Sequence, residues 1–145
     1  MILVMKPSSK VITFKGRFLG ITFLVVIQFI NGIIHTFSGL ALFLGGYIPV
    51  ASSSMEPLIF SFYTLIYGLM SVFFTYLLWN GKRLGWIGTV AISLFVIIAD
   101  ILTVFDLLTF LGIIKTAAIG EVPYSALIII YLLQKHVRLK YEIKL

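Results

Sequence analysis

Four long apolar runs, separated by short polar segments, dominate the pattern of this chain. Residues 18–55 contain no Asp, Glu, Lys or Arg, and a helix that crosses a membrane needs about 20 predominantly apolar residues. Gly, Pro and Ser residues end the first run, and basic or small residues separate the others. The pattern predicts an all-α, four-transmembrane-helix antiparallel bundle, with spans at about 18–45, 57–79, 84–110 and 121–134.

Composition agrees with a membrane protein of one domain. Of the 145 residues, 61% are hydrophobic and 11% are charged, whereas an ordinary soluble domain has about a quarter charged residues. We expect one transmembrane domain at 18–134, between a cytoplasmic N-terminal tail at 1–17 and a basic cytoplasmic tail at 135–145. The chain has no cysteine, which excludes disulfides, thiolate metal sites and a cysteine nucleophile.

Basic residues predict how the chain is oriented in the membrane. With four spans, ten of the eleven Lys and Arg residues fall on one side: Lys6, Lys10, Lys15, Arg17, Lys82, Arg83, Lys135, Arg138, Lys140 and Lys144. Only Lys115 falls on the other side. The positive-inside rule places both termini in the cytoplasm, and we expect the protein in the cell membrane. The net charge of +6 is then explained by anionic lipid, and no nucleic-acid partner is expected.

A stripe of polar residues lies on the first predicted span. Gln28, Asn31 and His35 are spaced i, i+3, i+7, which places them on one helical face. Ser93 and Asp100 lie on one face of the third span. At 1.5 Å per residue, His35 is about 24 Å and Asp100 about 21 Å from the basic side. The sequence predicts that these five residues form one intramembrane polar cluster.

The cluster has two interpretations. Ionisable residues inside membranes often mark function, so His35 and Asp100 are candidates for a proton relay, or for a polar site that takes an ion or a quinone-like head group. Alternatively, the cluster holds helices in register, since polar contacts between membrane helices contribute only about 0.6 kcal/mol on average. We favour the second interpretation from sequence alone.

The second span carries a face for close helix packing. Small and weakly polar residues repeat three and four apart, and small side chains let two membrane helices approach closely. They are Ser61, Thr64, Gly68, Ser71 and Thr75. Tyr63 and Tyr67 on the same span are candidates either for packing or for hydrogen bonds to the polar cluster.

No catalytic residue, metal site or cofactor is predicted. His136 lies in the basic tail, too far from His35 for both to bind one haem, and no third metal ligand accompanies either histidine. The chain has no nucleophile elbow, phosphate-binding loop or zinc-protease helix motif. A membrane enzyme or quinone-site protein therefore has the least support.

Two stretches resemble small prokaryotic four-helix membrane proteins of unknown function. They are YGLMSVFFTYLLWNGKRLGW and YSALIIIYLLQKHVRLKY. In both, an apolar span runs into a basic segment, and the resemblance covers the second half of the chain better than the first. It implies a four-helix membrane fold and carries over no functional residue.

The sequence leaves two classes of function open. With short loops and no extramembrane domain, the favoured class is an accessory or structural subunit of a larger membrane complex. Its expected partners are the lipid bilayer and other membrane subunits or copies of itself. The alternative is an oligomeric transporter or proton-conducting protein that uses His35 and Asp100.

Overall fold

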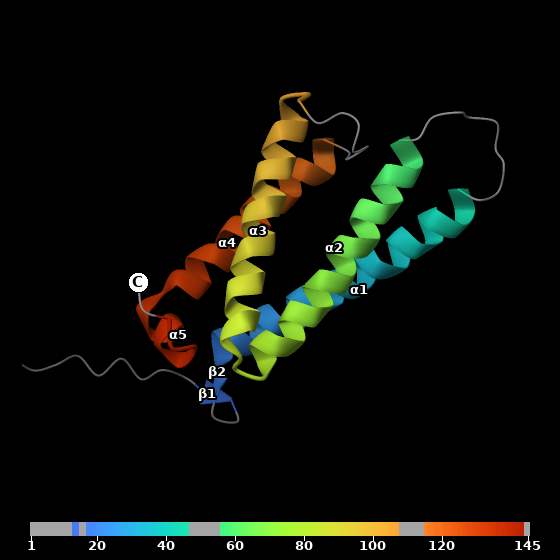
Figure 1. Ribbon diagram of the computed structural model, residues 1–145. Coiled ribbons are helices and arrows are strands. Elements are labelled where there is room, and N and C mark those ends of the chain that lie inside the picture. The colour runs from blue at the N-terminus through green and yellow to red at the C-terminus, as the bar shows by residue number, and fades with distance from the viewer. Residues whose placement is uncertain (1–12, 15–16, 47–55, 108–114, 144–145) are drawn as a thin grey trace, which may run out of the picture.

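The computed structural model describes residues 13–14, 17–46, 56–107 and 115–143. Four long helices and one short helix make up almost all of this part of the chain (Figure 1). They are α1 (Leu19–Gly46), α2 (Glu56–Trp79), α3 (Arg83–Val104), α4 (Lys115–Leu133) and α5 (Lys135–Lys140). Each long helix is apolar and long enough to cross a membrane, which confirms the prediction of four such helices.

Helix α4 begins earlier than the apolar pattern suggested. Its first residue is Lys115, and Pro123 lies inside it rather than in its first turn. Proline has no N–H to donate to the carbonyl of Ile119, but membrane helices tolerate this loss when neighbouring groups bind the free carbonyl. Before the connection between α3 and α4, helix α3 ends at Val104. Residues 108–114, expected to end the third span and begin this connection, lie outside the described residues.

Helices α1 and α2 pack closely because glycine lies at their contacts. A Cβ atom on Gly68 would meet the backbone of Thr36 and Gly32, and one on Gly39 would meet the backbone of Leu65. The small residues predicted to form a packing face on α2 are all buried: Ser61, Thr64, Gly68, Ser71 and Thr75. Helices α3 and α4 form a second pair, and the two pairs diverge away from the α2–α3 turn (Figure 1).

The turn between α2 and α3 is a tight helix end at Gly81. This residue has φ of +71°, a conformation that glycine adopts without a steric penalty. The N–H groups of Lys82 and Gly81 donate to the carbonyls of Leu77 and Leu78, each at 3.0 Å. This Schellman arrangement satisfies two carbonyls that have no partner within the helix. It brings the start of α3 directly against the end of α2.

The end of the molecule that contains this turn and α5 is called here the basic half. Its apolar core contains Ile21, Leu24, Val25, Leu78, Trp86, Ile128, Leu132, Val137, Tyr141 and Ile143. Two side chains also bond to carbonyls near helix ends. Trp86 Nε1 donates to the carbonyl of Leu132 at 3.0 Å, and the Tyr141 hydroxyl donates to that of Leu78 at 2.9 Å. The basic half is therefore held by both apolar packing and hydrogen bonds.

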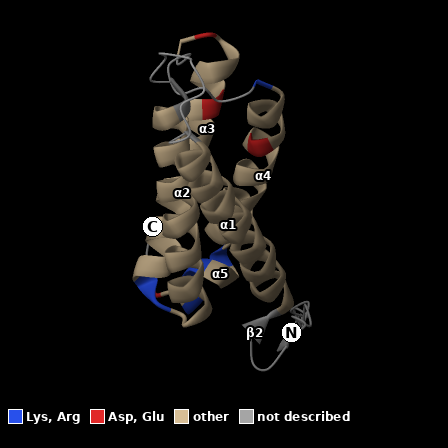
Figure 2. Cartoon of the chain, turned by 90° about the vertical axis from the view of Figure 1, so that its right-hand side faces the viewer, with Lys and Arg blue, Asp and Glu red and all other residues tan. Residues whose placement is uncertain are grey.

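The basic C-terminal segment folds back onto this core. Val137, Tyr141 and Ile143 are buried, while the blue Lys and Arg positions gather around α5 and the α2–α3 turn in Figure 2. At the other end of the chain, a two-residue strand pair joins Thr13–Phe14 (β1) to Arg17–Phe18 (β2) ahead of α1. The opposite end of the bundle, where the helix pairs diverge, is called here the far half.

Candidate functional site: a polar cavity in the far half

A cavity of about 180 Å³ lies in the far half and is lined by residues from all four long helices. Most of its wall is apolar or aromatic, and its ionisable residues come from three different helices. The lining residues are Ile34, His35, Ser38, Leu42, Phe60, Tyr63, Thr64, Tyr67, Asp100, Ala117 and Glu121. Because ionisable residues from distant parts of an apolar chain line this cavity together, it is the strongest candidate for a functional site.

His35 uses one ring nitrogen within α1 and the other to reach α4. Nδ1 lies 2.9 Å from the carbonyl oxygen of Asn31, which only accepts, so Nδ1 carries a proton and donates it. Nε2 lies 3.4 Å from Oε1 of Glu121. An imidazole Nε2 and a carboxylate oxygen are both acceptors, so they attract one another only when a proton lies between them. The pair is therefore either imidazolium with carboxylate or imidazole with carboxylic acid.

Tyr67 of α2 packs against the His35 ring, and Tyr63 of the same helix packs against Tyr67. The ring of Tyr67 meets the imidazole edge-on at 4.8 Å between centroids, and its hydroxyl accepts a bond from Asn31 Nδ2 at 3.4 Å. Tyr63 stacks parallel to Tyr67 at 6.5 Å. These contacts fix the ring of His35, because edge-to-face and stacked rings constrain each other's orientation.

Asp100 of α3 lines the same cavity but, unlike His35 and Glu121, its side chain has no partner among the described residues. The residue is only 1% exposed, and neither carboxyl oxygen has a hydrogen-bond partner among the described residues. Asp106, six residues further on and beyond the end of α3, is instead exposed and paired with Lys115 at 2.7 Å. Because a bare buried charge is costly, Asp100 requires either a proton of its own or a donor that enters the cavity.

The residues predicted to form one polar cluster are distributed over two regions. His35 and Asp100 line the cavity, and Asn31 borders it through its bond to Tyr67. The partner that the structure assigns to His35 is Glu121, not Asp100. Gln28 and Ser93 are buried but do not line the cavity, and Gln28 Oε1 has no partner within the described part of the chain.

Glu121 is the site residue that sequence reasoning missed. The last span was predicted to begin at about residue 121, which placed Glu121 at the membrane surface. Because α4 begins at Lys115, Glu121 lies about 9 Å inside the helix. A signal was present: Glu121 shares a helical face with Ala118 and Ser125, three and four residues away, and both are buried.

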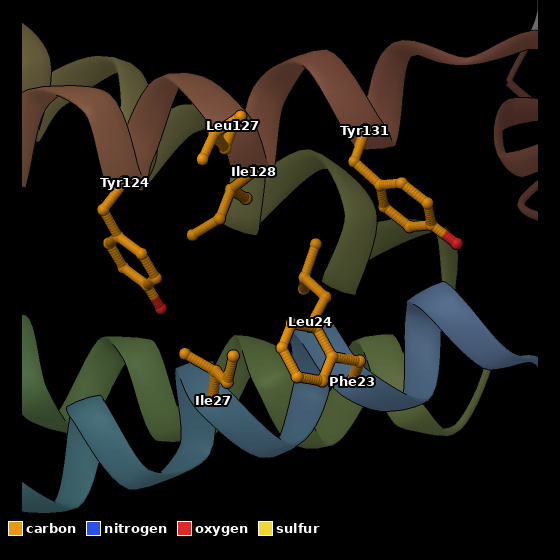
Figure 3. A pocket seen from close by; sticks show the side chains of 7 residues that line it. All are labelled: Phe23, Leu24, Ile27, Tyr124, Leu127, Ile128 and Tyr131. Carbon is orange, nitrogen blue, oxygen red and sulfur yellow. The ribbon is translucent and has the colours of Figure 1, made fainter.

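A second, almost wholly apolar groove of about 310 Å³ lies between α1 and α4. Figure 3 shows Tyr124 and Tyr131 of α4 with their rings turned toward α1, where Phe23, Leu24 and Ile27 form the facing wall. Leu127 and Ile128 complete the lining. The Tyr124 hydroxyl is buried and has no partner among the residues described.

The four apolar helices are compatible with a small multi-pass membrane protein and suggest a membrane location. Comparison with protein-family models, with curated proteins and with solved structures finds no match to this chain. What the protein does must therefore be inferred from its own residues. In the part of the chain that the structure describes, no three His, Asp or Glu side chains lie close enough together to hold a metal ion.

Proposed function

We propose that this chain is a proton-conducting transport protein of the cell membrane that works through its far-half cavity. The observation that carries the proposal is that His35, Asp100 and Glu121, from three helices, line one cavity. At 1.5 Å per residue, His35 and Asp100 lie about 24 and 25 Å from the basic ends of α1 and α3. Ionisable side chains within membrane-spanning helices are costly and are typical of proton and ion pathways.

The proposed orientation is an antiparallel bundle with both termini in the cytoplasm. It is supported by the Lys and Arg positions around α5 and the α2–α3 turn (Figure 2) and by the positive-inside rule. The far half then lies toward the external side of the membrane. The cavity would exchange protons with the external solution, and the packed basic half would lie between the cavity and the cytoplasm.

The chemistry of the cavity fits proton exchange. His35 and Glu121 attract one another through a single shared proton, and Asp100 offers a second proton-binding group without competing bonds. Toward the basic half, Gln28 Oε1 and the hydroxyls of Thr75 and Thr89 are buried without partners among the described residues. Buried polar groups of this kind usually bind water, so they would provide a proton route between the cavity and the cytoplasm.

Reconstituted vesicles test this proposal. A potassium gradient with valinomycin drives proton entry, which a pH-sensitive dye trapped inside reports. We expect flux in the wild type and a loss of about tenfold or more in Asp100→Asn and Glu121→Gln, because neither amide exchanges a proton as a carboxyl group does. Asp106→Asn is the matched control and should retain full flux. Flux that is unchanged by Asp100→Asn would contradict the proposal.

A second candidate function is an accessory subunit of a larger membrane complex or of a homo-oligomer. It is favoured by the apolar groove between α1 and α4, beside which Leu127 and Ile130 are largely exposed. A partner helix would bury these side chains by filling the groove. Purification in mild detergent tests this candidate: stoichiometric co-purification supports it, and a monodisperse monomer counts against it.

A further inference from the structure

We propose that the far-half cavity binds a small protonated amine that carries an apolar body. This inference rests on the proposed transport function, because it names a class of solute for the same cavity. It is argued from the charge, the walls and the size of that cavity.

The charge balance of the cavity leaves one carboxyl group without a counterpart. His35 bonds to Glu121, which accounts for one of the two carboxyl groups. Asp100 remains, and both of its oxygens are buried and without partners among the described residues. Two free acceptor oxygens on one carboxylate match the N–H groups of an ammonium ion, and bonds of this kind are stronger than those between neutral groups.

The walls of the cavity suit the rest of such a molecule. Tyr63, Tyr67 and Phe60 supply aromatic surface from α2, and Ile34 and Leu42 supply aliphatic surface from α1. Aromatic faces attract ammonium ions, most strongly where water is excluded. The cavity therefore offers an apolar surround for a carbon skeleton and a cation-binding group at Asp100.

Size limits the ligand to a compact molecule. The cavity measures about 180 Å³, and an apolar cavity of about 150 Å³ is enough to hold benzene. A single-ring or short-chain amine fits this space, whereas a lipid or a polyamine does not. A tightly bound metal ion fits poorly, because it needs several ligands close together.

Binding of benzylamine to the detergent-solubilised chain tests the proposal. Equilibrium dialysis with labelled benzylamine should show saturable binding, while benzyl alcohol, its neutral counterpart of the same shape, should bind at least tenfold more weakly. Asp100→Asn should weaken benzylamine binding by about tenfold or more, since it removes a charged hydrogen-bonding partner. Asp106→Asn is the matched control, because this carboxyl group is exposed and lies outside the cavity lining.

A second variant keeps the test valid if Asp100→Asn fails to fold. Ser38 lines the cavity and is exposed, so Ser38→Phe fills the space without removing a charge. It should abolish saturable binding. Equal binding of benzylamine and benzyl alcohol, or unchanged binding in both variants, would overturn the proposal.

The outcomes also separate this proposal from proton conduction. Proton flux in vesicles without saturable benzylamine binding would leave the proposed function standing and remove the amine site. Benzylamine binding that depends on Asp100, without proton flux, would establish the site and remove proton conduction. The quaternary benzyltrimethylammonium ion, which is larger and has no N–H group, should bind more weakly than benzylamine, and tighter binding would contradict the role assigned to the Asp100 oxygens.

Discussion

The two halves of the molecule are built in opposite ways. In the basic half, buried apolar side chains from α1 to α5 form one core, and Trp86 and Tyr141 bond to carbonyls near helix ends. In the far half, the helix pairs diverge (Figure 1) around a cavity that contains His35, Asp100 and Glu121. The contact between His35 and Glu121 joins α1 to α4 there.

This difference separates stability from function. Ionisable groups in an apolar environment lower stability unless they are paired, and the far half contains one such group, Asp100, without a partner among the described residues. The apolar packing of the basic half can offset this cost. We therefore expect substitutions in the basic half to affect mainly folding, and those at the cavity to affect mainly function.

The largest effect should come from the core of the basic half. Leu132 is fully buried, whereas Leu127 on the same helix is 67% exposed. Leu132→Ala leaves a cavity and should lower the free energy of unfolding by about 2 kcal/mol or more, and Leu127→Ala should have little effect. Unfolding in detergent, followed by circular dichroism, measures both. If Leu132→Ala and Leu127→Ala lowered the free energy of unfolding equally, the apolar core of the basic half would not be the main source of stability.

A smaller effect is expected at the contact between α1 and α2. Gly68→Ala places a methyl group against Thr36 and Gly32 and should cost about 1–3 kcal/mol through overpacking. Gly120 in α4 has open space where a Cβ would lie, so Gly120→Ala should be neutral or stabilise by up to about 1 kcal/mol. The same unfolding measurement applies. Tolerance of Gly68→Ala would mean that the two helices do not approach as closely as described.

The link between α1 and α4 in the far half should contribute less. Glu121→Ala removes the partner of His35 and should lower the free energy of unfolding by about 1 kcal/mol. Glu121→Gln should keep most of this stability, because its amide N–H can donate to Nε2 of a neutral His35. Thermal unfolding compares the two. If Glu121→Gln and Glu121→Ala lost the same stability, a hydrogen bond through a shared proton would not account for the contact between His35 and Glu121.

The smallest effect should come from a single hydrogen bond in the basic half. Tyr141→Phe removes the bond to the Leu78 carbonyl and should cost about 0.5–1.5 kcal/mol. Tyr76→Phe, at a position that is 62% exposed, is the control and should leave unfolding unchanged. If Tyr141→Phe leaves the free energy of unfolding unchanged, apolar packing alone holds α5 against the bundle.

The sequence predicted the long helices because a membrane-spanning helix is determined by the residues of a single continuous segment. An apolar run of about 20 residues has few structures open to it in a membrane, so the absence of charges from 18 to 55 was sufficient evidence of a span. The polar stripe was also readable, since helical spacing places Asn31 and His35 on one face. Their depth relative to Asp100 followed from the rise per residue.

The partners of these side chains depend on non-local packing. The last span was predicted to begin at about residue 121, at the membrane surface, whereas α4 begins at Lys115. The role of α5 was hidden by its basic residues, since Val137 and Tyr141 are buried only because the segment folds back onto α2 and α3. Neither contact leaves a periodic signal in a chain of 145 residues.

Thiol labelling tests the contrast between the two halves most directly. The chain has no cysteine, so Ser38→Cys, at the cavity, and Thr89→Cys, in the basic half, each introduce a single thiol. In oriented vesicles, a membrane-impermeant maleimide should label Ser38→Cys from the external side and leave Thr89→Cys unlabelled from either side. If Ser38→Cys is unreactive, or is labelled only from the cytoplasmic side, the far half does not contain a water-accessible cavity that faces outward.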